Sequence, residues 1–492
     1  MLDARADFAA DADPGAGSVT GRIASFRANS REHAASITVA ALSGGFGVFL
    51  LQITAMLSVY VNHQNVAQHD TAQAALAILT VVFTAIAMYV GAIVTTNTFA
   101  TIIAGRRRSI ALMRLIGATA STIRQSVANE GLIVGIIGAL IGVVVGVALS
   151  LGVLAVLLRT SVIPSLHYPL VSFSIVAPIV VVVLSTWAAS WIGSRRVITV
   201  TPLEAVGSAA EASVGDTRIH PVRNVVSAVS FFVGLALVGI GVAAGQSGVF
   251  GLPIAFIGGL LSFVGLTLGA QLFIPWALRG VGALFGRSAP AILAAQNAVR
   301  YPERSTRTTI GIVIGVTLIT TLTVASQTFN SLIQSAQAAA PQVFAGSTTI
   351  LNVIAEVFGG LIGFSVLVAA VGVVNNLSLS VVQRSRELGL LRAVGLSARQ
   401  VRAMILIESA QMTLTATLIG LVLGFFYGWA GAQSLLGSIA RKAAGNGFVP
   451  LTVPWLFIII AIAVSFIFAT GASIGPIRRA VRLSPVEALA TE

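Results

Sequence analysis

The sequence predicts an all-α integral membrane protein whose ten transmembrane helices are arranged four, two and four as a parallel internal repeat. Three observations lead to this fold class. Of the 492 residues, 56% are hydrophobic and only 9% are charged, and the mean hydropathy is +0.95, whereas soluble domains are about one quarter charged. Ten apolar runs are long enough to cross a bilayer, and polar residues recur in the same order in the two halves. A soluble enzyme and a single-span receptor are therefore excluded.

The apolar runs fall into three groups, each run near or above the roughly 20 residues that span the hydrocarbon. They lie at about 37–60, 72–103, 131–158 and 170–192, then 225–244 and 252–272, then 308–326, 350–381, 413–436 and 453–470. This grouping divides the chain into four parts. They are a polar, disordered cytoplasmic tail (1–21), a first four-helix unit (22–206), a linker with the central helix pair (207–296) and a second four-helix unit (297–492).

The distribution of basic residues predicts the orientation in the membrane. With the amino terminus inside, the external loops near 62–71, 159–169, 245–251, 327–349 and 437–452 contain only Arg159, Arg441 and Lys442 of the 29 basic residues. Positively charged loops are retained on the cytoplasmic side. We therefore expect a multi-pass protein of a bacterial cytoplasmic membrane with both termini in the cytoplasm.

An internal repeat relates the two four-helix units. Eight polar or glycine positions in the first unit recur 278 residues later without a gap: Asn97, Arg106, Arg108, Arg114, Gly117, Glu130, Gly142 and Gly146 match Asn375, Arg384, Arg386, Arg392, Gly395, Glu408, Gly420 and Gly424. Residues 195–206 recur at an offset of 283. An even number of spans separates the copies, so they share one orientation and present similar surfaces to the cytoplasm. This predicts a two-fold partner below the membrane.

The cytoplasmic segment of each copy is predicted to be a bent pair of helices. Few helix-breaking residues occur between 72 and 115, so a long helix should project beyond the hydrocarbon, end at Gly117, and be followed by a second amphipathic helix near Ser121. In the second copy, Leu388, Leu391 and Val394 form an apolar face beside arginines. Such a surface suits lipid headgroups or a groove on a partner.

Residues 384–395, with Arg399, Gln400 and Glu408 and the terminal segment 485–489, resemble the FtsX-like permease family, the membrane subunits of MacB-type ABC transporters. The resemblance implies that the segment after the second helix of each unit is a coupling region that docks on an ATPase. The coupling residues implied are Arg106, Arg108, Leu112, Arg114, Gly117, Arg384, Arg386, Glu387, Leu388, Leu391, Arg392 and Gly395. It further implies two copies of an ABC ATPase, which would bind the ATP and Mg²⁺, and no cofactor in this chain.

The chain departs from the family pattern in two respects. Ser109 stands where the second copy has Glu387, so the two halves need not hold the ATPases equally. The large extracellular domain typical of several members is missing, because the external loops are short. We expect a permease that exports or extracts a hydrophobic peptide, lipid or drug, in contact with membrane lipid. An envelope protein or lipoprotein is a further candidate partner. Two alternatives stay open: a non-transporting permease that signals to an envelope partner, and a secondary transporter.

Several kinds of chemistry are not expected. There is no cysteine, and the only lysine, Lys442, precedes Ala443, so no Walker A motif is present and we expect no enzymatic activity in this chain. The arginines are dispersed between spans, which argues against nucleic-acid binding. His63, His69 and Asp70 lack a fixed framework, so no metal site is predicted.

Three glutamates lie near or within spans. Glu356 falls in the outer half of the eighth span, where a carboxylate is costly unless it reaches water or a partner, so it is a candidate contact for substrate or partner. Glu130 and Glu408 are predicted to stabilise helix starts. Scarce buried charge weakens the secondary-transporter alternative. Small residues at four-residue spacing predict close helix packing; they are Gly138, Gly142 and Gly146, Gly420, Gly424 and Gly428, Gly311 and Gly315, and Gly265 and Gly269.

Overall fold

The computed structural model describes part of the chain, and the statements on structure below concern that part. It comprises residues 30–63, 81, 82, 85, 89, 92, 96, 107–159, 168, 175–195, 221–248, 250–286, 288–300, 302–339, 391–392, 394–444, 447–464 and 466–467. Within these residues the regular structure is helical throughout, and no strand occurs. The all-helical class predicted from the sequence is confirmed for them.

The helices are long and follow the predicted apolar runs. Their bounds are Ser30–His63 (α3), Arg107–Leu115 (α5), Ala120–Arg159 (α6), Val176–Gly193 (α7), Pro221–Gly245 (α8), Gly251–Gly282 (α9), Ala289–Arg300 (α10), Pro302–Ala339 (α11) and Ala398–Ala444 (α15). A 3₁₀ turn, Ala283–Phe285 (η7), extends α9, and a shorter apolar helix covers Trp455–Val464.

Seven of the helices are long and apolar enough to cross a membrane: α3, α6, α7, α8, α9 with η7, α11 and α15. An integral membrane fold is thus supported. Of the other predicted spans, 453–470 coincides with the short helix Trp455–Val464. The span at 350–381, with Glu356, lies outside the described residues, and only six positions of 72–103, all helical, lie inside them. The count of ten spans stays a prediction.

Two helices extend far beyond their predicted spans. α6 has 40 residues and α15 has 47, which at 1.5 Å per residue gives lengths of about 60 and 70 Å, roughly twice the hydrocarbon thickness. The second amphipathic helix expected near Ser121 does begin there, but it is continuous with the span, because no strong helix breaker occurs between Ala120 and Gly131.

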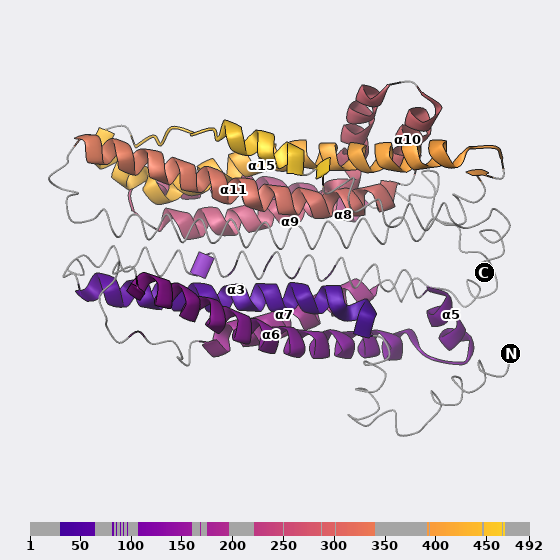
Figure 1. Ribbon diagram of the computed structural model, residues 1–492, viewed down its shortest axis with the longest axis horizontal. Coiled ribbons are helices and arrows are strands. Elements are labelled where there is room, and N and C mark those ends of the chain that lie inside the picture. Colours follow the sequence, from indigo (N-terminus) through magenta and orange to yellow (C-terminus); the bar gives the residue numbers. More distant parts are fainter. Residues whose placement is uncertain are drawn as a thin grey trace.

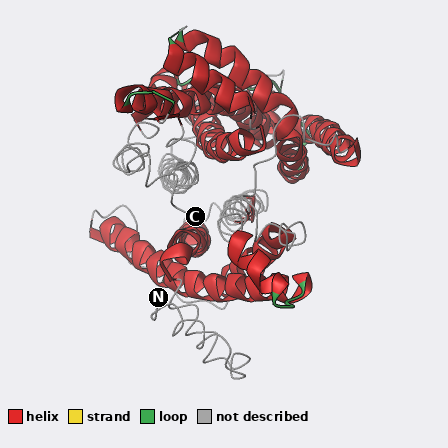
Figure 2. Ribbon diagram, turned by 90° about the vertical axis from the view of Figure 1, so that its right-hand side faces the viewer, coloured by secondary structure: helices red, strands yellow, loops and turns green. Residues whose placement is uncertain are grey.

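The helices form two groups (Figure 1). One contains α3, α6 and α7, and the other contains α8 to α11 with α15. In the part of the chain that the structure describes, extensive helix contacts stay within each group, and the end-on view separates the groups clearly (Figure 2). The central pair α8 and α9 therefore packs on the second four-helix unit. Leu42 and Tyr89 of the first unit also reach the apolar core of the second.

The predicted small-residue stripes mediate close packing within each group. Gly142 on α6 faces α3, where an added Cβ would lie 2.6 Å from the Gly45 nitrogen and 2.7 Å from the Ala41 oxygen. The matching Gly420 on α15 faces α11, where an added Cβ would lie 2.7 Å from Val316 Cβ. Small residues thus let the helices approach closely, as expected for helices in lipid.

These contacts extend the repeat to the first helix of each unit. Gly146 faces Val48 on α3, and the matching Gly424 faces Thr320 on α11. α3 and α11 therefore occupy the same place in their units, although their offset is 272 rather than 278 and their sequences share little. Matching the sequences of the two halves does not reveal this correspondence. A helix can pack closely against a glycine of its neighbour with many different residues at the contact, so the sequences of α3 and α11 need not be alike.

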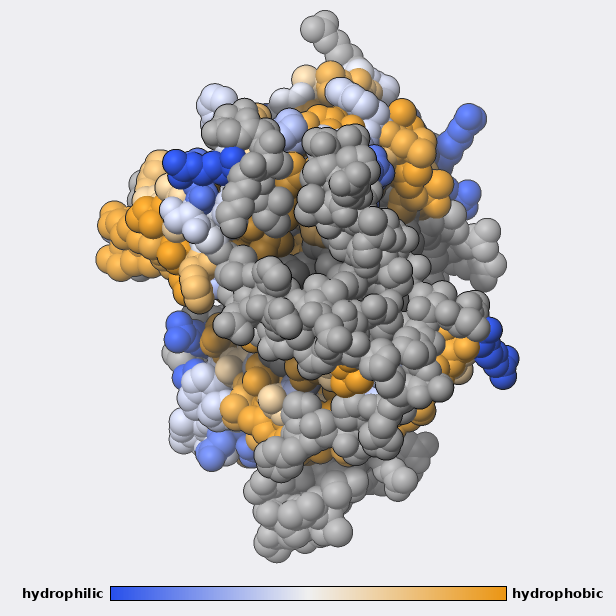
Figure 3. All heavy atoms as spheres, turned by 90° about the vertical axis from the view of Figure 1, so that its left-hand side faces the viewer, coloured by the Kyte–Doolittle hydropathy of each residue, from blue (hydrophilic) through white to orange (hydrophobic). Residues whose placement is uncertain are grey.

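Both units have the same polarity. α5, α10 and the start of α15 lie at one end of the molecule (Figure 1, right). The opposite end presents apolar and hydrophilic side chains side by side (Figure 3). The first elbow region and the matching start of α15 thus lie at the same end, and the full parallel arrangement of two four-helix units stays a prediction.

Candidate functional site

Each unit contains a sharp bend between a helix end and the long helix that follows. The first elbow comprises residues 112–119, between α5 and α6, and the second comprises residues 391, 392 and 394–397, before α15. Gly117 and Gly395 stand at the bends with φ of +106° and +112°. This left-handed conformation favours glycine, which has no Cβ.

The two elbows have the same backbone hydrogen bonds. In the first, Gly117 N donates to Arg114 O (3.1 Å) and Ala118 N donates to Met113 O (2.9 Å). In the second, Gly395 N donates to Arg392 O (3.1 Å) and Leu396 N donates to Leu391 O (3.0 Å). This is the Schellman pattern, which satisfies the last carbonyl groups of a helix. Gly117 therefore ends its helix as predicted, and the repeat holds at the level of individual hydrogen bonds.

A capping residue then starts each long helix. Thr119 Oγ1 accepts a hydrogen bond from Thr122 N (3.2 Å), and Ser397 Oγ accepts one from Gln400 N (3.2 Å). In the second elbow, Gln400 Oε1 also accepts from Ser397 N (2.9 Å), which completes a capping box. The helix starts are thus set by hydroxyl residues two positions after the glycines.

The position of these caps corrects the prediction for Glu130 and Glu408. Both residues lie about ten positions inside α6 and α15, so neither stabilises a helix start. Glu408 is buried, with 6% of its surface exposed. The prediction is wrong because it assumes that an interfacial helix ends and a separate span begins at each glutamate. In the structure, α6 and α15 each continue without a break through this position.

Apolar contacts fix each elbow to its long helix. Ile123 and Val127 on α6 form a buried cluster with Ile110 and Ala111 of α5. The equivalent residues on α15, Val401 and Ile405, form a cluster that also packs against Leu391 and Leu396 of the second elbow. Motion of an elbow must therefore carry the long helix with it, because protein interiors are close-packed.

An exposed apolar side chain precedes the glycine of each elbow. Ile116 and Val394, which match in the repeat, are both 76% exposed. Leu112, Met113 and Leu115 of α5 are 43%, 47% and 52% exposed. Gly117 lies 14 residues before Gly131, so along the axis of α6 the bend is about 20 Å below the start of the predicted span. Exposed apolar side chains at such a distance from the hydrocarbon mark a surface for another protein.

The structure places the predicted coupling residues as follows. Leu112 is exposed on α5, and Arg114 lies in its last turn, where a cation interacts favourably with the helix dipole. Leu391 packs partly buried within the second elbow, and Arg392 beside it is half-buried. Arg108 lies in α5, but its side chain is outside the described residues, as are Arg106, Arg384, Arg386, Glu387 and Leu388 entirely. Their role stays a prediction.

Two features of the elbows were not among the predicted site residues. Ile116 and Val394 are exposed at the tips. The sequence places Val394 on an apolar face with Leu388 and Leu391, but it does not single out Ile116. On the first unit, the Arg124 guanidinium lies 4.3 Å from the ring centre of Trp191 at the end of α7.

Among the described residues, no group of three acidic or histidine side chains that could hold a metal ion occurs.

The comparisons with known proteins agree with this duplicated layout. The model of the FtsX-like permease family, C-terminal region, matches twice, at residues 81–202 and 359–485. The second match begins and ends at the same offsets, 278 and 283, that relate the two copies. Each match includes one elbow.

Individual relatives match over part of their length. The chain is 28% identical over 151 residues to an uncharacterised ABC transporter permease of Bacillus subtilis, YknZ, covering 31% of this chain and 35% of the relative. A second uncharacterised ABC transporter permease, from Methanocaldococcus jannaschii, is 28% identical over 145 residues, or 30% of this chain and 35% of the relative.

A macrolide export ATP-binding/permease protein, MacB of Wolinella succinogenes, is 31% identical over 143 residues, or 29% of this chain and 20% of the relative. The chain thus spans about a third or less of the length of these relatives. The two family matches together cover half of the chain, and both contain the glycine bend just described. The chain therefore belongs to the FtsX-like permease family.

Proposed function

We propose that this chain is the permease subunit of an ABC transporter, which couples ATP hydrolysis by two separate ATPase subunits to the export or extraction of a hydrophobic peptide, lipid or drug. The observation that carries the proposal is the pair of matched elbows, each with an apolar tip at Ile116 or Val394 beside an arginine. The relatives named as ABC transporter permeases and the fused ATP-binding/permease relative support the same role.

Two equal elbows at one end of the molecule suit a two-fold ATPase. The backbone hydrogen bonds match between the copies, and the exposed fractions of Ile116 and Val394 are equal. Mere contact with headgroups would require an amphipathic surface but not this residue-level correspondence. With no Walker A lysine in the chain, the ATP and Mg²⁺ would be held by the partner ATPases.

The membrane arrangement proposed is ten spans in a four, two, four order with both termini in the cytoplasm of a bacterium. It rests on the apolar runs and on the placement of 26 of the 29 basic residues between spans on one side. The elbows then face the cytoplasm, where ATP is available.

The mechanism proposed is mechanical. When the ATPases close on ATP, they press the two elbows together, and α6 and α15 transmit the movement across the bilayer. Both helices run unbroken from the elbow to the far end of the molecule, and the clusters around Ile123 and Val401 fix the elbows to them. A rigid helix of about 60 Å is long enough to move a gate on the opposite side.

The test is copurification of the ATPase with the full-length permease. Val394→Asp places a carboxylate on the exposed tip without disturbing the buried cluster, and we expect it to reduce the ATPase bound by at least tenfold. Arg392→Glu should have a similar effect, and Arg114→Glu a milder one, because Ser109 precedes the first elbow at the position where Glu387 precedes the second. The matched control is Leu149→Asn on the exposed lipid-facing side of α6, which should leave association unchanged.

The outcomes separate the proposal from its rivals. If no ATPase copurifies and Arg392→Glu leaves activity intact, a secondary transporter is favoured. If an ATPase copurifies equally with Val394→Asp and Arg392→Glu, the elbows are not its docking surface. ATPase activity in liposomes separates the remaining two: stimulation by a hydrophobic amphiphile supports transport. Stimulation by an envelope protein and by no amphiphile would favour a non-transporting signalling permease.

A further inference from the structure

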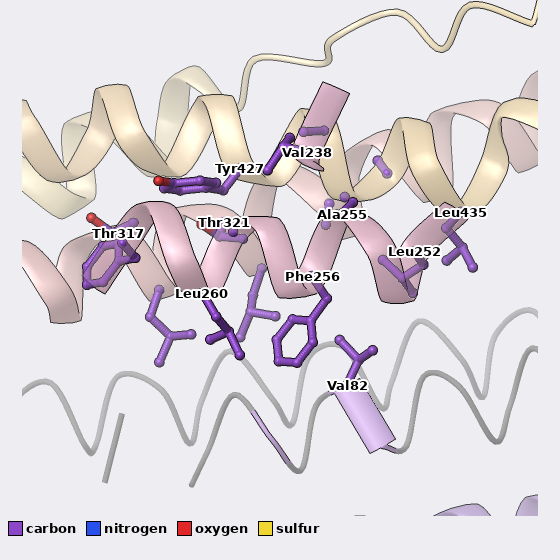
Figure 4. A pocket seen from close by; sticks show the side chains of 18 of the residues that line it. Val82, Val238, Leu252, Ala255, Phe256, Leu260, Thr317, Thr321, Tyr427 and Leu435 are labelled. Atoms are coloured by element: carbon purple, nitrogen blue, oxygen red, sulfur yellow. The ribbon is translucent and has the colours of Figure 1, made fainter. Parts of the chain in front are cut away.

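A cavity of about 180 Å³ lies where the first unit, the central pair and the second unit meet. Val82 and Tyr89 line it from the first unit, Val238 from α8, and further residues from α9, α11 and α15. Figure 4 shows Phe256 and Leu260 extending from α9 toward Val82. Because α8 and α9 supply part of the wall, the duplicated units alone would not form this cavity.

The wall is apolar and uncharged. Every described residue that lines the cavity is aliphatic, aromatic, glycine or threonine, apart from two tyrosines, and none carries a charge. In the absence of a charged group, an ammonium, carboxylate or phosphate would lose its hydration without compensation. The described part of the wall therefore favours an uncharged ligand.

Two hydroxyl groups at this wall lack a hydrogen-bond partner within the described structure. Thr317, 4% exposed, leaves its Oγ1 unpaired, and the buried hydroxyl of Tyr89 is also unpaired. The Tyr427 hydroxyl, also at this wall, shares a hydrogen bond of 2.7 Å with Ser262. By contrast, Thr323 on the same helix as Thr317 donates to the carbonyl of Ile319. Buried hydroxyls normally find a partner, so Thr317 and Tyr89 offer donors to a bound molecule.

The size and depth of the cavity narrow the ligand further. A cavity of about 150 Å³ accommodates benzene, so this one holds an aromatic ring or a short length of hydrocarbon chain. Tyr427 lies 32 residues beyond Gly395, about 50 Å along α15 from the second elbow. The cavity is therefore in the half of the membrane opposite to the elbows, which is the outer half in the proposed orientation.

We propose that this cavity binds the apolar part of a neutral amphiphile that carries a carbonyl or ether oxygen, with the hydroxyls of Tyr89 and Thr317 as donors to that oxygen. The inference rests on the proposed function, since such an amphiphile is the class of cargo that the permease would release at the outer side. The ring contacts from Phe263 to Tyr89 and to Tyr427, each with centroids 6.3 Å apart, place one aromatic residue of α9 between the two units at the ligand.

The first test uses two glycines at which an added Cβ meets open space. Gly431 lines the cavity and Gly239, on α8, does not. The full-length protein in lipid nanodiscs is labelled with a fatty-acid methyl ester that carries a diazirine, and the labelled peptides are identified by mass spectrometry. We expect saturable labelling of residues 427–436 or 252–263, reduced at least fivefold by Gly431→Leu and unchanged by Gly239→Leu. Equal saturable labelling in both variants would overturn the proposal.

The second test addresses the hydroxyl groups. Tyr89→Phe and Thr317→Val remove the donors with little change of shape, and Thr323→Val is the matched control. We expect the first two variants to weaken binding of the ester probe about three- to tenfold and to leave binding of a diazirine-bearing alkane unchanged. If the ester binds all variants equally, the hydroxyls do not recognise the oxygen and that part of the proposal is wrong.

Competition separates a cargo from bulk lipid, whose acyl esters carry the same carbonyl. Because the described wall residues carry no charge, we expect an unlabelled neutral ester to displace the probe and phosphatidylglycerol at equal concentration not to do so. Displacement by phosphatidylglycerol would assign the cavity to membrane lipid and reject a cargo site. The labelling experiment needs no ATPase. If no ATPase copurifies with the permease but saturable labelling of the cavity is observed, the proposed function is rejected and the binding site is not.

Discussion

In the first unit α6 packs between α3 and α7, whereas in the second unit the corresponding α15 packs against α11, the central pair and α10. The elbow that precedes each of these helices nevertheless has the same hydrogen bonds and the same exposed tip. A duplicated fold has therefore kept its bends alike while the helices around them diverged. This is expected if the bends meet two equal partner surfaces and the flanks serve different purposes.

The supports of the two elbows also differ. In the first unit, Arg124 near the start of α6 stacks on Trp191 of α7. In the second, Ala294 of α10 is fully buried against Met404 and Ile405 of α15. The second elbow thus has an additional helix beneath it and a reciprocal cap at Ser397. Because the contacts that support the two elbows differ, the elbows are expected to differ in stability even though their exposed tips are alike.

The cavity follows the same asymmetry, because its wall combines the central pair with the second unit. Among the residues that the structure describes, Val82 and Tyr89 line it from the first unit. In this part of the chain both units contribute to the cavity wall, and the central pair that completes it packs on the second unit. Three sets of variants can sharpen this comparison between the units.

The largest effect is expected from alanine at the glycines where the long helices cross. A Cβ at Gly142 meets only backbone atoms of α3, at 2.6 to 3.0 Å, whereas a Cβ at Gly420 meets Cβ and Cγ1 of Val316 at 2.7 and 2.8 Å and the Thr317 nitrogen at 3.2 Å. Rotation of Val316 relieves the Cγ1 contact, but its Cβ moves only with the backbone of α11, so both helix crossings must open and the first must open more. We expect Gly142→Ala to destabilise by about 3 kcal/mol and Gly420→Ala by about 1 kcal/mol, within the range of overpacking.

Thermal unfolding of the purified protein in one detergent measures this difference. Gly152→Ala on α6 is the control, because a Cβ there meets open space. Equal losses for Gly142→Ala and Gly420→Ala would show that the two helix crossings are equivalent, against the packing described.

Much of the fold class could be predicted from composition and from runs of apolar residues, because both reflect the solvent that surrounds the helices. The bends at Gly117 and Gly395 could also be predicted, because a glycine after a helix with a basic last turn is a strong local signal. Val394 could be placed on an apolar face from its spacing with Leu388 and Leu391, but the exposure of Ile116 could not be predicted, because an apolar residue in a sequence carries no sign of whether a neighbour will cover it.

Features that depend on packing between distant segments could not be predicted from the sequence. The correspondence of α3 with α11 rests on how closely they approach Gly142 and Gly420, and not on shared residues. The association of the central pair with the second unit, and the cavity at that junction, follow from tertiary arrangement alone. The role predicted for Glu130 and Glu408 was wrong because a charge at the edge of an apolar run resembles a helix start. The sequence alone does not show that the helix is continuous on both sides of the glutamate.

An intermediate and equal effect is expected at the two bends. Alanine at Gly117 or Gly395 must adopt a positive φ, and no other atom lies within 4 Å of an added Cβ in either case. The expected loss is therefore purely conformational, about 1.5 kcal/mol at each site. Asparagine, which tolerates this conformation better, should recover part of the loss.

Hydrogen exchange of the amides at residues 117–118 and 395–396 reports the change locally. Gly280→Ala on α9, where an added Cβ also meets open space, is the control and should not affect the bends. A loss at Gly395 that is much larger than at Gly117 would mean that the bends are not equivalent, and the shared geometry would then be no argument for equal partners.

The smallest effect is expected at the caps, and here the units should differ. Ser397 both accepts from Gln400 N and donates its own N–H to Gln400 Oε1, whereas Thr119 has only the first of these bonds to Thr122. We expect Ser397→Ala to cost about 1 kcal/mol and Thr119→Ala about 0.5 kcal/mol, measured by exchange of amides in the first turn of α15 and α6. Gln400→Ala removes the two hydrogen bonds that Gln400 Oε1 accepts, from Ser397 N and from Ser397 Oγ, and keeps the bond from the amide of residue 400 to Ser397 Oγ. It should therefore bring the second cap to the stability of the first. If Gln400→Ala has no effect while Ser397→Ala does, the extra stability of the second elbow comes from α10 packing on Val401 and Met404, and not from its cap.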